Sequence, residues 1–197
     1  MLSDKLKNHK IILASASPRR QQFFREMGLD FEIRIKSVEE IYPNQLEGSA
    51  ISDYLAELKA SAFEGTLASN EILITSDTVV WHKNISLAKA EGAGEAFAML
   101  KTLSGDWHEV ITSVCFTTKD YQKTVNQTTK VKFNVLKDEE IRFYIENYKP
   151  FDKAGAYGIQ EWIGLIGIEK IEGSYPNVVG LPTHLVYETL LDIMACG

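Results

Sequence analysis

The stretch "KIILASASPRR", residues 10–20, joins an apolar run directly to a helix start, and this junction constrains the fold strongly. The apolar run predicts a buried strand. Ser17 suits the N-cap position, because its hydroxyl can accept from a free backbone N–H, and Pro18 suits the first helical turn. We expect a helix over about 18–27, closed by Gly28 just after the C-cap. A strand that turns straight into a helix is typical of α/β proteins.

The rest of the chain keeps alternating strand and helix patterns. Predicted strands cover about 31–35, 71–81, 108–118 and 123–136, and a strand with a turn is predicted over 163–173. Predicted helices cover about 50–63, 93–103, 137–148 and 181–195. A charged turn at Lys119 and Asp120 would join the third and fourth strands as a hairpin, which predicts an antiparallel patch around 107–135. No linker rich in Gly, Pro or Ser divides the chain. We therefore expect an α/β fold with a mixed sheet, in one domain over residues 1–197.

Composition limits the partners of the chain. With 197 residues, a formal net charge of −6 and a pI near 5.3, the balance argues against binding to nucleic acid or to an anionic membrane surface. The N-terminal segment lacks the apolar stretch of a signal peptide, and no segment approaches the roughly 18 apolar residues that would cross a bilayer. Cys115 and Cys196 have no metal-like spacing and indicate reduced thiols. These features predict a cytoplasmic protein.

Arg19 and Arg20 stand where a helix usually prefers acidic residues. A helix N-terminus carries partial positive charge, so two cations there lower local stability unless an anion binds. A strand, a turn of small residues and a helix N-terminus with arginines together are typical of a phosphate site. Two solvated arginines on a surface helix are an equally good interpretation of this pattern alone.

Three acidic residues stand out. Asp77 lies in an otherwise apolar strand between Ser76 and Thr78, where an unpaired carboxylate would cost several kcal/mol. A metal ligand or general base is favoured over a salt-bridged structural aspartate, because polar residues at strand ends are where α/β ligand sites gather. Glu39 and Glu40 form a second acidic pair, and their spacing alone indicates solvated side chains more than a metal site.

The glycine-bearing segment "GAYGIQ", residues 155–160, is a further candidate. Glycines at this density let a backbone approach a ligand closely, and the amide of Gln160 can match both donor and acceptor edges of a base. A simple turn between elements is the alternative interpretation, and the segment "GSYPNVVGLP" has the same ambiguity. The histidines show no paired metal spacing and are expected to be surface or structural residues, and the chain has neither a nucleophile elbow nor a P-loop.

Taken together, "LASASPRR", "VEE", "LAELKA", "SDTVV", "DKAGAYGIQ" and "GSYPNVVGLP" resemble the Maf family of nucleoside triphosphate pyrophosphatases. The matches keep the family order and run from about residue 11 to residue 186. The resemblance implies an elongated mixed-sheet α/β fold with two lobes around a central active-site cleft, similar to the inosine triphosphatase fold. It also implies hydrolysis of a nucleoside triphosphate to the monophosphate and pyrophosphate with a divalent metal cation, Mg²⁺ or Mn²⁺.

The resemblance carries functional residues over position by position. The implied residues are, for phosphate and substrate binding, Ser15, Arg19, Arg20, Thr78 and Gln160; for catalysis, Asp77, Glu40, Lys59 and Lys89; and for the metal, Asp77 and Glu40. Which of the two acids acts as the base stays open. Two positions depart from the family pattern, because Ala90 replaces the usual proline after Lys89 and Glu161 replaces the usual glycine after Gln160.

Arg19, Thr78 and Tyr157 follow the pattern of the subgroup that hydrolyses dTTP and UTP. Cleavage of 7-methyl-GTP, as in a sister subgroup, is the enzymatic alternative. A non-enzymatic nucleotide-responsive factor in cell division is the alternative from another class, although a binder would need the arginines and not the acids. We expect a small-molecule nucleotide as the partner, with no nucleic acid and no membrane, and the sequence leaves a homodimer open.

Overall fold

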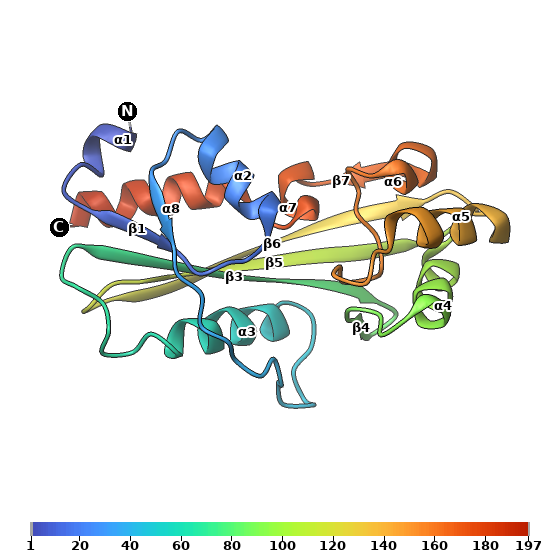
Figure 1. The fold of residues 1–197 in the computed structure, drawn as a ribbon, viewed down its shortest axis with the longest axis horizontal. Helices are drawn as coiled ribbons and strands as arrows, with labels where there is room; N and C mark the ends of the chain where they lie inside the picture. The colour runs from blue at the N-terminus through green and yellow to red at the C-terminus, as the bar shows by residue number, and fades with distance from the viewer. Residues whose placement is uncertain (1, 197) are drawn as a thin grey trace. The chain divides into compact units, whose positions relative to one another are not determined.

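The computed structural model describes residues 2–196 (Figure 1). The helices are α1 (Leu2–Lys5), α2 (Pro18–Glu26), α3 (Ser49–Ser61), α4 (Ala93–Leu103), α5 (Asp138–Tyr148), α6 (Trp162–Gly167), α7 (Tyr175–Val179) and α8 (Thr183–Cys196). The strands are β1 (Lys10–Leu13), β2 (Phe31–Ile33), β3 (Glu71–His82), β4 (Ile85–Leu87), β5 (Trp107–Thr117), β6 (Gln122–Phe133) and β7 (Ile168–Glu172). No helix within these residues is long and apolar enough to span a membrane.

Within residues 2–196, seven strands form one mixed sheet in the order β2-β1-β3-β5-β6-β7, and β4 pairs with β3. β1 runs parallel to both β2 and β3, whereas β3 with β4 and β6 with β7 are antiparallel. The short connection 118–121 joins the neighbouring strands β5 and β6, which confirms the predicted hairpin. The predicted α/β class with a mixed sheet is therefore correct.

The chain folds into two compact units. The first unit comprises the chain up to Asp77, the segment Thr112–Gln127 and the chain from Gly180 on. The second unit comprises Thr78–Ile111 and Thr128–Val179. Strands β3, β5 and β6 each contribute residues to both units.

In the first unit, helices cover both faces of the strands, with α2 and α8 on one face and α3 on the other (Figure 1). Side chains of β3 alternate between these two layers. Ile72 and Ile74 pack in the cluster that contains Phe24 of α2, whereas Leu73 packs in the cluster that contains Ala56 of α3. This alternation follows from the two-residue period of a strand, and burial on both faces explains why Ile72, Leu73 and Ile74 are all apolar.

Helix α2 is bounded as its sequence predicts. The hydroxyl of Ser17 accepts from the backbone N–H of Arg20 at 3.5 Å, and Pro18 opens the helix. Gly28 has a φ of 68°, and its N–H donates to the carbonyl of Arg25 at 3.0 Å. A positive φ at this position costs glycine little, which is why the helix stops here.

The second unit has its own core, in which α4 and α5 pack with the remaining strand segments. Leu100 of α4, Phe133 of β6 and Ile141 of α5 are fully buried in one cluster. The carboxylate of Glu140 accepts from the backbone N–H of Lys137, and this contact caps the start of α5. The predicted helices over 93–103 and 137–148 are confirmed within one residue.

One predicted element is wrong in its first half. Residues 163–173 were expected to form a strand and a turn, but Trp162–Gly167 is helix α6 and only Ile168–Glu172 is a strand. A short apolar run does not distinguish a strand from a helix by periodicity alone. Gly164 also packs so tightly that a Cβ there would lie 1.8 Å from the carbonyl oxygen of Ile159, so this approach requires glycine.

Candidate active site

Lys59 forms ion pairs with two acidic residues of the predicted site, and all three residues lie in the first unit. Its ammonium nitrogen lies 2.5 Å from Oδ1 of Asp77 and 2.9 Å from Oε1 of Glu40. Helix α3 carries Lys59, strand β3 carries Asp77, and Glu40 lies in the segment between β2 and α3. One cation therefore holds two carboxylates that are 37 residues apart in the sequence, and the group keeps a net negative charge.

Asp77 lies within β3 rather than at a strand end beside a polar turn, where the sequence suggested it. The strand runs without interruption from Glu71 to His82, and the polar side chains of Thr75 and Asp77 find partners inside the fold. The hydroxyl of Thr75 donates to the carbonyl of Ala56 at 2.6 Å. Asp77 itself is only 8 % exposed, and Lys59 supplies the partner that a buried carboxylate requires.

Arg20 is oriented by the backbone. Its Nε donates to the carbonyl of Gly180 at 2.8 Å and its Nη1 donates to the carbonyl of Ser76 at 3.0 Å. Burial lowers the pKa of Arg20 from its ordinary value, while the charge of Asp77 acts in the opposite direction. The alternative of two solvated surface arginines is therefore wrong for Arg20, whose guanidinium is held in place beside Asp77.

The loop before α2 is equally constrained. Ser15 is buried, and its hydroxyl accepts from the backbone N–H of Ser17 at 3.2 Å. The carbonyl of Ser15 accepts from the side-chain amide of Gln21 at 3.2 Å. Arg19 is half-buried in the first turn of α2, and that turn contains no acidic residue. This helix start thus keeps the positive character that suits an anion.

The structure brings Ser15, Arg19, Arg20, Glu40, Lys59 and Asp77 into the first unit, and it places Thr78, Lys89 and Gln160 in the second. Lys89 pairs through its backbone with Ala154 in an isolated antiparallel bridge. The N–H of Gly155 donates to the carbonyl of Leu87 at 2.9 Å. The segment around Lys89 is thus tied to the glycine-bearing segment that leads to Gln160.

At two glycines of the segment 155–160, neighbouring side chains of the protein occupy the space that a Cβ would need. Gly155 has a φ of 66°, and a Cβ there would lie 3.0 Å from Cγ1 of Val80. A Cβ on Gly158 would lie 2.8 Å from Cδ of Glu161 and 3.0 Å from Nε2 of Gln160. The glycines permit close packing of neighbouring side chains, which the sequence interpretation in terms of ligand approach did not anticipate.

Tyr157 and His108 form a buried pair that sequence reasoning missed. The hydroxyl of Tyr157 lies 2.7 Å from Nε2 of His108, and the two rings meet edge to face at 5.4 Å. Burial lowers the pKa of His108 to about 3, so the imidazole is neutral at pH 7. This histidine is structural, as the absence of metal spacing suggested, and it fixes the tyrosine in the middle of the glycine-bearing segment.

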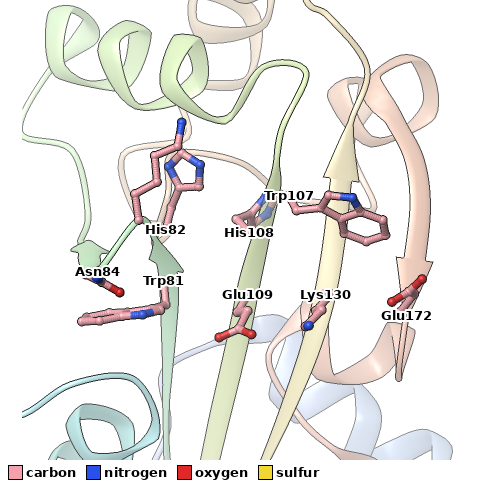
Figure 2. Close-up of a pocket in the computed structure, with 9 residues that line it drawn as sticks. Trp81, His82, Asn84, Trp107, His108, Glu109, Lys130 and Glu172 are labelled. Atoms are coloured by element: carbon pink, nitrogen blue, oxygen red, sulfur yellow. The ribbon is translucent and has the colours of Figure 1, made fainter.

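The second unit also holds an open pocket of about 610 Å³ (Figure 2). Figure 2 shows Trp81, Glu109, Lys130 and Glu172 in a row across β3, β5, β6 and β7. The complete lining is Trp81, His82, Lys83, Asn84, Trp107, His108, Glu109, Lys130 and Glu172. None of the predicted site residues lines it, so this pocket is distinct from the charged group around Lys59.

Asp77 and Glu40 are the carboxylates that the sequence assigned to a metal. Among residues 2–196, no group of three or more His, Cys, Asp and Glu side chains is arranged to hold a metal ion. Mg²⁺ commonly uses one or two carboxylates and completes its shell with water and substrate phosphates. Two adjacent oxygen donors beside Arg20 fit that pattern. Cys115 is a buried free thiol, and the side chain of Cys196 lies outside the described residues.

Comparison with known proteins places this geometry in context. A family model described as Maf-like protein matches residues 10–193. The chain is 60% identical to a dTTP/UTP pyrophosphatase of Flavobacterium johnsoniae over 194 residues, covering 98% of this chain and 100% of the relative. It is 45% identical to a dTTP/UTP pyrophosphatase of Bacteroides fragilis over 189 residues, covering 95% and 98%. The Ham1 protein of Staphylococcus aureus has a similar fold, with a TM-score of 0.53 at 17% identity over 93% of this chain and 99% of that one.

Proposed function

The chain belongs to the Maf-like protein family, and from that premise we propose that it hydrolyses dTTP and UTP to the nucleoside monophosphate and pyrophosphate. Relatives at 45% to 60% identity over nearly their full length are named dTTP/UTP pyrophosphatase. Those names favour the pyrimidine nucleotides over 7-methyl-GTP. The charged group around Lys59 contains acids as well as cations, which favours an enzyme over a nucleotide-responsive binding factor.

The contact of Lys59 with both Asp77 and Glu40, beside an oriented Arg20, is the observation that carries the proposal. A triphosphate repels an incoming nucleophile, so its hydrolysis needs positive charge on the phosphates and a carboxylate near the attacked phosphorus. Arg19 and Arg20 would bind phosphate oxygens at the start of α2, and Ser15 would hold the loop before it. Lys59 and Lys89 would supply further positive charge.

Asp77 is the proposed proton acceptor for the attacking water. It lies on a central strand and is fixed by Lys59, whereas Glu40 lies in a connecting segment and is half exposed. A fixed acceptor can take a proton in one geometry without the cost of ordering its side chain. The water would attack the α-phosphorus, the proton would pass to Asp77, and pyrophosphate would leave.

Asp77 and Glu40 would also hold a divalent cation, Mg²⁺ or Mn²⁺, since their oxygens suit such ions. When bound, such an ion neutralises phosphate charge. In that arrangement Lys59 would keep the two carboxylates together and limit their mutual repulsion. Arg20, tied to two backbone carbonyls, would keep its orientation whether or not the substrate is bound.

Gln160 would bind the base, and Thr78, which follows Asp77 in β3, would contact the same substrate. Uracil and thymine present two carbonyl acceptors around one N–H, and a side-chain amide can match both kinds of group. A base with the wrong pattern leaves buried polar groups unpaired, which costs about 1–3 kcal/mol each. The composition and the isolated cysteines favour action in the cytoplasm.

The test is the identity of the released phosphate. The purified protein should release pyrophosphate from dTTP and UTP in the presence of Mg²⁺ or Mn²⁺, and a chelator in excess should stop the reaction. Orthophosphate as the sole product, or full activity in excess chelator, would show that the proposal is wrong. A parallel panel with GTP and 7-methyl-GTP decides between the two enzymatic alternatives.

A further inference from the structure

Gln160 is presented by a tight turn at the end of a buried segment. The N–H of Glu161 donates to the carbonyl of Gly158 at 2.9 Å, which closes a four-residue turn with Gln160 at its third position. Residues 155–159 are buried, and Gln160 is exposed. The conformation of this turn therefore decides where the side chain of Gln160 leaves the backbone.

The hydroxyl of Tyr144 ties the two ends of the turn together. Tyr144 lies on α5 and is fully buried. Its hydroxyl donates to Oε2 of Glu161 and accepts from the backbone N–H of Gly158 at 3.0 Å. Burial and the bond to Glu161 raise the pKa of Tyr144 above its ordinary value, so the hydroxyl keeps its proton and stays a donor. A hydrogen bond to a carboxylate is about twice as strong as one between neutral groups.

Lys153 balances the charge of Glu161. Its ammonium nitrogen lies 3.1 Å from Oε1 of Glu161 and 2.7 Å from Oδ1 of Asp152, and the residue is only 8 % exposed. Both carboxylate oxygens of Glu161 thus have partners, Tyr144 for one and Lys153 for the other. The negative charge that departs from the family pattern is compensated within the second unit.

Gly158 completes the arrangement. A Cβ at this position would lie 2.8 Å from Cδ of Glu161 and 3.0 Å from Nε2 of Gln160, so both side chains lie against the glycine backbone. The side chain of Gln160 therefore lies against the same turn that Tyr144 and Glu161 hold.

We propose that Glu161 and Tyr144 are positioning residues that set base selectivity by fixing the turn that carries Gln160. The inference rests on the proposed function, in which Gln160 binds the pyrimidine base. Neither residue needs to contact the nucleotide, because their bonds end on each other, on Lys153 and on the backbone of the turn. Loss of these bonds should affect discrimination between bases more than the rate of phosphate cleavage.

The experiment compares kcat and KM for dTTP and GTP in Tyr144→Phe, Glu161→Ala and Glu161→Gln. Tyr144→Phe removes only the bridging hydroxyl, and Glu161→Ala removes its acceptor. In both variants the ratio of kcat/KM for dTTP to that for GTP should fall about tenfold, mainly through a higher KM for dTTP. Glu161→Gln keeps an oxygen that can accept from Tyr144, so it should retain more of the selectivity than Glu161→Ala.

Matched controls separate this effect from general destabilisation. Tyr148→Phe changes a half-exposed tyrosine one turn further along α5, whose ring stacks on Tyr144 at 5.1 Å. Glu169→Gln changes a glutamate that pairs with Lys132 at 2.8 Å on the surface of the same unit. Both controls should keep the wild-type ratio. Amide hydrogen exchange of residues 155–161 gives a readout without activity, since Tyr144→Phe should increase exchange at Gly158.

An unchanged dTTP-to-GTP ratio in both Tyr144→Phe and Glu161→Ala overturns the inference, as does unchanged exchange at Gly158. If Tyr144→Phe fails to fold, the dTTP-to-GTP ratios of Glu161→Ala and Glu161→Gln test the inference, and an unchanged ratio in Glu161→Ala overturns it. Absence of pyrophosphate release by the wild-type protein overturns the proposed function instead. The exchange measurement then still reports whether Tyr144 fixes the turn.

Discussion

The charged group of the first unit and the Gln160 turn of the second are held in different ways. In the first unit, Lys59, Asp77 and Glu40 hold one another through ion pairs, and Glu40 is half exposed. In the second unit, the turn that carries Gln160 is held by bonds that other residues make, through Tyr144, Gly158 and Glu161. The ion pair of Glu40 with Lys59 lies near solvent and can exchange partners when an anion or cation binds, whereas the hydrogen bonds around the buried Tyr144 keep their shape. The difference suits chemistry in the first region and recognition in the second.

Asp77→Asn should give the largest effect and is the strongest test of the first region. The amide keeps the shape of the side chain but loses the charge that accepts a proton, so kcat should fall about a thousandfold. Nucleotide affinity should stay within about tenfold, or roughly 1.4 kcal/mol. Steady-state kinetics and a direct binding titration measure the two quantities. If the variant retains most of its kcat, Asp77 is not the proton acceptor, and the assignment of the chemistry to the first unit is wrong.

Arg20→Ala should follow, with about a hundredfold loss in kcat/KM through both a higher KM and a lower kcat. The change removes a guanidinium that two backbone carbonyls hold beside Asp77. Arg20→Lys keeps the charge but not the planar fork, so it should recover only part of the loss. Full recovery by Arg20→Lys would show that the orientation of the guanidinium is unimportant.

The pH dependence of protein stability tests whether His108 of the second unit is a buried, neutral, structural residue. Its pKa is lowered from 6.5 to about 3 in the folded state, so the folded protein binds fewer protons than the unfolded chain between these values. Neutral His108 therefore contributes its full share to the free energy of unfolding above about pH 6.5, and this share is lost as the pH falls towards 3. Denaturant unfolding should show that His108→Gln reduces the slope of stability against pH in this window by about 1.4 kcal/mol per pH unit. An identical slope in both proteins would contradict the assignment.

Ser17→Ala should have the smallest effect. It removes the N-cap acceptor of α2 and should lower the free energy of unfolding by about 1 kcal/mol. Ser17→Asn keeps an acceptor at the same position and should remain close to the wild type. Thermal unfolding of the three proteins measures the difference, and equal stability of Ser17→Ala and wild type would show that the cap contributes nothing.

Local signals in the sequence predicted most of the elements. Ser17, Pro18 and Gly28 bounded α2 because capping depends on a few adjacent residues. The strand predicted for residues 163–167 is wrong, since neither the length nor the periodicity of this run distinguishes a short helix from a strand. Its conformation depends on contacts outside the run, as the close approach of Gly164 to the carbonyl of Ile159 shows.

The side-chain contacts of the site were less accessible from the sequence. The family motifs predict which residues belong to the charged group. They do not predict the pairing of Lys59 with Asp77, because that contact requires α3 to pack against β3. One partner of Glu161, Tyr144, lies 17 residues earlier on α5, and nothing in the local sequence identifies it. Contacts of this kind depend on tertiary packing, which periodicity and capping do not encode.

The most direct test of the division between chemistry in the first unit and recognition in the second compares Arg20→Ala with Gln160→Ala on dTTP and GTP. Arg20→Ala should lower kcat/KM for both nucleotides by a similar factor, because it acts on phosphates that the two substrates share. Gln160→Ala should lower kcat/KM for dTTP and leave that for GTP nearly unchanged, so that selectivity falls. The opposite result, a selective loss in Arg20→Ala and a uniform loss in Gln160→Ala, would contradict the division between chemistry and recognition.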